Sequence, residues 1–224
     1  MGWRQARSRD RPHGRPSRLH APEALESRQA FSISPVALPG AAFEPAWLGS
    51  AVSTALRGAA LPMASPGPTG FTPAQIRHAY GLDQISFGGT PADGRGTTIA
   101  IVTAYDSPNI AVDLATFDAT FGIPAPPSFQ KVNQTGGSTL PVFNPSWSTE
   151  TCLDVQWAHA IAPGASILLV EAKSNATADM LAAVRYARSA PGVVAVSMSW
   201  GQAEYAGETV DDVTFTTSGI VFVP

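Results

Sequence analysis

The pattern of hydrophobic and polar positions divides the chain near residue 70. Before that point, short apolar pieces are interrupted by Pro and Gly, and no helical or strand period continues for long. From residue 71 onward, periodic segments follow one another closely. We therefore expect a disordered, Arg-, Pro- and Gly-rich segment over 1–70, with at most a weak helix at 46–56, and an ordered domain over 71–224.

Several segments of this domain have the spacing or the punctuation of helices. The clearest begins at Thr72, a good N-cap residue, continues with Pro73 in the first turn and closes at Gly81. Apolar residues three and four positions apart, or a closing Pro-Gly, predict the others. The predicted helices cover 72–81, 109–121, 147–164, 177–189 and, as a short one, 208–216.

Short apolar runs of four to six residues predict buried strands between these helices. They lie at 99–103, 166–171, 193–197 and 219–223, and the Pro-, Gly- and Ser-rich stretch 122–146 is predicted to be a long loop. The order of elements predicts an α/β fold, a parallel sheet with helices on both faces. In such sheets the functional loops follow the carboxyl ends of the strands. Because Pro224 directly follows the last strand, we expect a domain truncated at its C-terminal side.

Charge and composition narrow the possible partners. Residues 1–70 carry a net charge of +4 and residues 71–224 one of −7, with only two lysines in the chain. An acidic, sparsely charged domain argues against a nucleic-acid partner. No apolar run approaches the roughly 18 residues that span a membrane, and no apolar core of a signal peptide follows the N-terminal arginines. The single cysteine, Cys152, excludes an intrachain disulfide and a Cys-rich metal site.

The first candidate for chemistry is a pair of acids, Glu150 and Asp154, in the helix predicted at 147–164. Residues four apart on a helix lie on one face, roughly 5–6 Å apart at Cβ, and like charges there are unfavourable. From spacing alone, two exposed helical acids are the more frequent explanation. The alternative is a pair that shares a proton, with amides of the helix N-terminus favouring ionised Glu150 and Asp154 holding the proton.

The wider pattern around the pair resembles a known family. Trp147-x-x-Glu150-x-x-x-Asp154-Val-Gln-Trp-Ala-His-Ala-Ile-Ala-Pro-Gly is followed by Ile-Leu-Leu-Val-Glu-Ala and then by Val-Val-Ala-Val-Ser-Met-Ser-Trp-Gly. Together with the opening Phe-Thr-Pro-Ala-Gln-Ile-Arg-His-Ala-Tyr-Gly, these motifs resemble the sedolisins, or serine-carboxyl peptidases. The resemblance runs from about residue 71 to residue 224 and covers the N-terminal part of that family's catalytic domain.

The resemblance implies a subtilisin-like fold and a secreted, acid-acting serine endopeptidase that cleaves peptide or protein substrates. Glu150 matches the family's general base and Asp154 the acid that orients it. A substrate-binding strand and turn are matched by four residues: Ser197, Ser199, Trp200 and Gly201. The family's calcium site lies in the part of the domain that the resemblance does not reach, so we expect no cofactor or metal in this chain.

Two motifs of the family are missing from the sequence. Neither Gly-Asp-Ser-Gly, which carries the oxyanion Asp, nor Gly-Thr-Ser, which carries the nucleophilic serine, occurs in the 224 residues. We therefore expect this chain alone to be inactive, with the serine that the Glu-Asp pair would activate lying beyond it. The alternative is a catalytically inactive fragment without an enzymatic role.

Other enzyme classes fit less well. A true subtilisin needs a catalytic Asp and His in their own motifs, but Asp106 precedes Ser-Pro and His159 precedes Ala-Ile, so His159 is interpreted as a packed or surface helix residue. A dinucleotide fold requires its glycines after the first strand, whereas Gly94 and Gly96 precede it. An acid glycosidase also uses two carboxylates, but nothing here resembles a sugar cleft.

Overall fold

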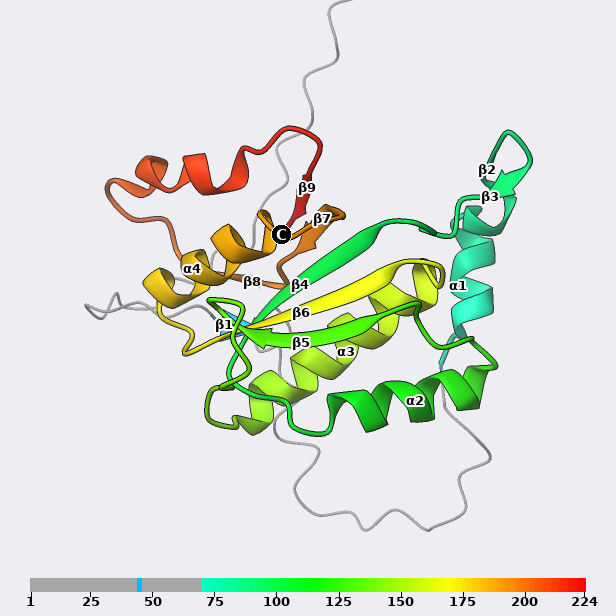
Figure 1. Cartoon of the computed structure of the whole chain (residues 1–224), viewed down its shortest axis with the longest axis horizontal. Helices are drawn as coiled ribbons and strands as arrows, with labels where there is room; N and C mark the ends of the chain where they lie inside the picture. Colours follow the sequence, from blue (N-terminus) through cyan, green and yellow to red (C-terminus); the bar gives the residue numbers. More distant parts are fainter. Residues whose placement is uncertain (1–43, 46–69) are drawn as a thin grey trace, which may run out of the picture. The chain divides into compact units, whose positions relative to one another are not determined.

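The computed structural model describes residues 44–45 and 70–224. Its main sheet has five parallel strands in the order β5-β6-β4-β7-β9. The strands are β4 (Thr98–Ala104), β5 (Phe129–Asn133), β6 (Ser166–Ala172), β7 (Val193–Ser197) and β9 (Val221–Val223). Helices lie on both faces of this sheet (Figure 1). The predicted α/β fold class is therefore confirmed.

Each face of the sheet has its own hydrophobic core. On one face, α2 (Ile110–Phe121) and α3 (Pro145–Ile161) cover β4 and β6, and on the other lies α4 (Thr177–Ala187) (Figure 1). The α2–α3 side buries Ile101, Ile110, Leu114, Val155, Ile167 and Leu169. Strands covered on both faces carry apolar residues without alternation, which is why β4 and β6 were predictable from short apolar runs.

The predicted first helix is confirmed as α1 (Pro73–Ala79). The Thr72 hydroxyl accepts the Gln75 backbone N–H, and the Gln75 side chain accepts the Thr72 N–H, a complete capping box. The Arg77 guanidinium donates to the Ile161 carbonyl at the end of α3. A cation at a helix C-terminus satisfies the free carbonyl groups there and offsets the helix dipole.

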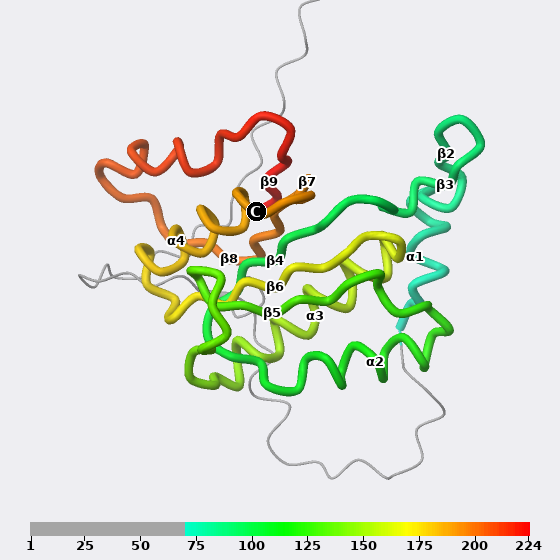
Figure 2. The backbone as a smooth tube through the Cα atoms, in the orientation of Figure 1, coloured from blue at the N-terminus to red at the C-terminus, as the bar shows by residue number. Residues whose placement is uncertain are grey.

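Two short elements lead from α1 into the sheet. A 3-10 turn, η2 (Leu82–Gln84), is followed by the antiparallel hairpin of β2 (Ser86–Phe87) and β3 (Thr90–Pro91). Figure 2 traces this path from the hairpin into β4. No helix among the described residues has both the length and the apolar character needed to cross a bilayer.

The fold differs from the sequence prediction in several places. The expected loop 122–146 contains the edge strand β5, whose mixed sequence Phe-Gln-Lys-Val-Asn carries no long apolar run. The short helix predicted at 208–216 is two 3-10 turns, η3 (Glu208–Val210) and η4 (Asp212–Phe215). A two-residue strand, β8 (Trp200–Gly201), pairs antiparallel with β1 (Glu44–Pro45). The weak helix expected at 46–56 lies outside the described residues.

Candidate functional site

The two acids singled out in the sequence lie on α3. This helix begins at Pro145, and its N-cap Asn144 accepts hydrogen bonds from the Ser146 and Trp147 backbone N–H groups at 3.0 and 3.1 Å. Glu150 therefore lies beyond the first turn, where the amides are already bonded within the helix. Its side chain is 3% exposed, and Asp154, one turn further on, is partly buried. The pair is thus not the exposed pair that spacing alone would favour.

Burial raises the pKa of both carboxyl groups. The pKa of Glu150 rises to about 7, first because its side chain is desolvated and second because Asp154 is negative. The pKa of Asp154 rises to about 6 because of burial, although a hydrogen bond from Ser199 opposes the rise. Both pKa values are raised, and the expectation that Glu150 is the ionised partner and Asp154 the protonated one stays a prediction. Its helix-dipole argument fails because α3 starts earlier than predicted.

The predicted substrate segment follows β7 and meets the pair at one point. The Ser199 hydroxyl donates to Asp154 Oδ1 at 2.7 Å, which joins residues from two distant parts of the chain. Ser197 ends β7 and pairs with Ile101 of the central strand. The segment from Ser197 to Ser199 therefore lies along the same side of α3 as Asp154.

The other two predicted substrate-binding residues differ from each other in exposure. The Trp200 indole N–H donates to the Val102 carbonyl at 2.8 Å, and its side chain is 9% exposed. Its ring therefore anchors the segment to the sheet. Gly201 is exposed, and in β8 it pairs with Glu44 of β1. The edge of β8 thus accepts an extended backbone in antiparallel pairing.

A groove of about 520 Å³ opens beside Asp154. Apolar side chains form most of it, and its lining includes Ile99, Leu153, Asp154, Trp157, Ser197 and Val223. One oxygen of each acid, Glu150 Oε2 and Asp154 Oδ2, is buried and has no hydrogen-bond partner. Buried carboxyl oxygens without partners are costly, and each can still bond a hydroxyl group or a water molecule. Asp154, which lines the groove, can therefore exchange a proton with a group placed in it.

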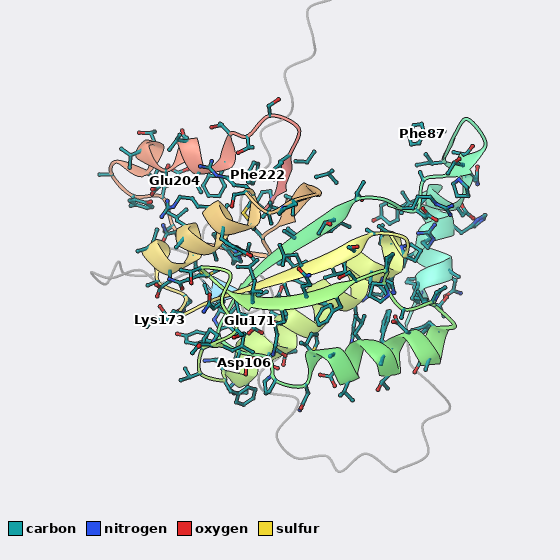
Figure 3. All side chains as sticks on the ribbon, viewed as in Figure 1. Phe87, Asp106, Glu171, Lys173, Glu204 and Phe222 are labelled. Atoms are coloured by element: carbon teal, nitrogen blue, oxygen red, sulfur yellow. The ribbon has the colours of Figure 1, made fainter. Side chains whose placement is uncertain are left out.

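A further buried acid was missed in the sequence. Glu171, the last residue but one of β6, is fully buried, and burial raises its pKa to about 8. Figure 3 shows it at the same end of the sheet as Asp106. Lys131 of β5 donates to Asp106 at 2.6 Å and lies 3.9 Å from Glu171 Oε1. A charged residue at the end of an otherwise apolar strand was the available signal.

Two other residues considered in the sequence, His159 and Cys152, are buried or partly buried and make contacts within the fold. His159 is fully buried and its Nε2 lies 2.9 Å from the Pro124 carbonyl, which agrees with the interpretation as a packed helix residue. The Cys152 thiol donates to Asp113 Oδ2 at 3.4 Å, and burial raises its pKa to about 11. Among residues 44–45 and 70–224, no group of three or more His, Cys, Asp or Glu side chains is arranged to hold a metal ion.

Comparisons with known proteins find likenesses among solved structures. No protein-family model matches the sequence, and no curated protein matches it. Among solved structures, the chain is similar to Pseudomonas sedolisin, a serine-carboxyl proteinase complexed with two molecules of pseudo-iodotyrostatin. The two share 25% identity with a TM-score of 0.47 over 56% of this chain. The match spans 37% of the sedolisin chain.

Proposed function

We propose that this chain carries the acid–base half of a serine-carboxyl endopeptidase site, with Glu150 as the general base and Asp154 as its supporting acid. The observation that carries the proposal is the hydrogen bond from Ser199 to Asp154. It joins the carboxyl pair to the segment that the sequence motif assigns to substrate binding. The unpartnered oxygens of both acids supply the acceptors that such a role requires.

In this proposal, Glu150 removes the proton from a serine hydroxyl that attacks the peptide carbonyl. With a pKa of about 7, Glu150 is protonated in acid as long as no group donates a hydrogen bond to its Oε2. A hydroxyl that donates to Oε2 favours the ionised form and lowers the pKa, which extends base catalysis toward acid pH. Asp154, held by Ser199, then accepts or shares the displaced proton.

The substrate is proposed to be an extended peptide that adds to the backbone edge at Trp200–Gly201. In this chain Glu44–Pro45 pairs with that edge in antiparallel register, so the peptide would take the place of these two residues. Adding a strand to an exposed edge is a general mode of peptide recognition. Secretion and action in acid belong to the same proposal.

The sequence contains neither Gly-Asp-Ser-Gly nor Gly-Thr-Ser, so we propose that the 224 residues alone do not cleave peptides. The first experiment incubates the purified chain with an unfolded protein substrate from about pH 3 to pH 7, a range that spans the ordinary and raised carboxyl pKa values. No cleavage is expected. Proteolysis that disappears in Glu150→Gln would show that this chain supplies its own nucleophile.

The second experiment reads the coding DNA downstream of codon 224. If it encodes Gly-Asp-Ser-Gly and later Gly-Thr-Ser, the longer product should cleave the substrate, and Glu150→Gln should lower kcat by about 10²-fold or more. Glu204→Gln, an exposed acid outside the site, is the matched control and should retain activity. An active longer product that is indifferent to Glu150→Gln would refute the assigned role. Absence of both motifs would favour the inactive fragment.

A further inference from the structure

The loop after β4 contains an unusual backbone conformation next to α3. Tyr105 has a φ of +63°, the one positive value among non-glycine residues in the described part of the chain. A left-handed residue other than Gly costs about 1–3 kcal/mol and persists only where its surroundings impose it. Here the Tyr105 N–H donates to the Ala172 carbonyl at 2.8 Å, and its hydroxyl donates to Asn175 Oδ1 at 2.9 Å. The loop is therefore tied to the end of β6.

Glu171 binds the same loop two residues further on. Its Oε1 accepts the Ser107 backbone N–H at 2.9 Å, and both side chains are fully buried. The Ser107 hydroxyl lies 2.8 Å from the Ser148 hydroxyl on α3. Ser148 precedes Glu150 by less than one helical turn. Two short contacts thus lead from Glu171 to the part of α3 that carries the candidate base.

Lys131 also binds Ser107, at its backbone carbonyl. Its Nζ donates to the Ser107 carbonyl at 3.0 Å and to Asp106 Oδ1 at 2.6 Å. Both backbone groups of Ser107 are therefore bonded by buried or nearly buried side chains, the N–H by Glu171 and the carbonyl by Lys131. Ser107 therefore has little freedom to move, because movement would break buried hydrogen bonds, and that costs free energy.

The protonation state of Glu171 fits this arrangement. Burial is the main cause that raises its pKa to about 8, against the opposing effects of the Ser107 N–H and Lys131. Its Oε2 is buried without a partner, and so is Thr103 Oγ1, the residue beside it in register on β4. A proton on Oε2 leaves Oε1 free to accept from Ser107. In acid, Glu171 is therefore a neutral carboxylic acid that still binds the loop.

We propose that Glu171 is a positioning residue that acts through Ser107 and Ser148 to hold the first turns of α3, and with them Glu150, in their buried place. The proposal rests on the proposed role of Glu150 as a base, but the contacts themselves are independent of any activity. The other titratable groups that face the loop are Asp106 and Lys131, already described. Two more titratable groups face the loop from the helices. They are Cys152 on α3, whose thiol pKa is affected by the Ser107 hydroxyl, and Asp113 on α2.

The test measures the pKa of Glu150 in the full 224-residue chain by carboxyl ¹³C NMR titration. Glu150→Gln identifies the resonance, and the wild-type value is expected near 7. Glu171→Ala removes the acceptor for Ser107, so water gains access to α3 and the pKa of Glu150 falls by about one unit or more. Glu171→Gln preserves the shape and hydrogen bonds of the neutral acid and should leave the pKa of Glu150 unchanged.

Variants at the far end of the relay keep the test decisive if Glu171→Ala does not fold. Ser148→Ala removes the contact with Ser107 without touching Glu171, and it should lower the pKa of Glu150 in the same direction. Ser146→Ala, an exposed serine of the same helical turn, is the matched control and should have no effect. Glu171→Asp, one methylene too short to reach Ser107, is the milder substitute for the alanine variant and should also lower the pKa of Glu150.

The outcomes separate a positioning role from a merely structural one. The proposal is wrong if the pKa of Glu150 keeps its wild-type value in a folded variant of Glu171, either Glu171→Ala or Glu171→Asp, and also in Ser148→Ala. If Ser146→Ala shifts it as much as Ser148→Ala does, the relay through Ser107 is also wrong. The titration involves no proteolysis, so failure of the proposed peptidase function would leave its result intact.

Discussion

Replacing the candidate base should stabilise the protein at neutral to alkaline pH. Glu150 is 3% exposed, and its pKa is raised from 4.5 to about 7 by burial and by the charge of Asp154. A shift of about 2.5 units corresponds to about 3 kcal/mol between the two protonation states. Gln has the shape of the neutral acid and never ionises, so Glu150→Gln avoids this cost.

The direction of the effect follows from proton linkage. Folded Glu150 binds its proton more tightly than the unfolded chain does, so its contribution to stability is full below pH 4.5 and is lost as the pH rises through about 7. Asp154 and Glu171, whose pKa values are also raised, act in the same direction. The wild-type chain should therefore be more stable in acid than at pH 8.

Urea unfolding, followed by tryptophan fluorescence at pH 4 and pH 8, measures the free energies of unfolding of the wild type and of the variant. At pH 4 the wild type and Glu150→Gln should have similar free energies of unfolding. At pH 8 the variant should be more stable by about 3 kcal/mol. Glu204→Gln, at an exposed position, should follow the wild type at both values. A variant that loses as much stability as the wild type between pH 4 and pH 8 would refute the buried, protonated state of Glu150.

Two further predictions concern the carboxyl pair and use the same NMR titration. Asp154→Asn removes the negative neighbour and should lower the pKa of Glu150 below about 7, though not to its ordinary value, because burial is the larger cause. Ser199→Ala removes the hydroxyl that favours ionised Asp154 and should raise the pKa of Asp154 above about 6. An unchanged Glu150 pKa in the first variant, or a lowered Asp154 pKa in the second, would contradict the geometry of the pair.

Local signals in the sequence were sufficient for most of the fold. The N-cap at Thr72 and the apolar runs of β4 and β6 depend on neighbouring residues, and the structure has them where they were predicted. The start of α3 was missed because Asn144 and Pro145 lie at the end of a Pro-rich stretch, although Asn at N-cap followed by Pro is a helix start signal. β5 was missed because an edge strand needs no long apolar run.

The candidate site was only partly predictable. The spacing of Glu150 and Asp154 put them on one face of a helix, but their burial and raised pKa values depend on what packs over that face. The Ser199–Asp154 hydrogen bond joins two segments that no local pattern connects. In the sequence, Glu171 looked like nothing more than the polar end of a strand. Its importance comes from contacts that other elements supply.

The sequence by itself determined the order of most helices and strands, the parallel character of the sheet and the identity of the acid pair. These follow from periodicity and capping, which act over a few residues. Only the tertiary structure decided which acids are buried, which keep their protons, and how Glu171 reaches α3 through Ser107. Desolvation and hydrogen bonding between distant segments arise when elements pack together, so they are properties of the assembled fold.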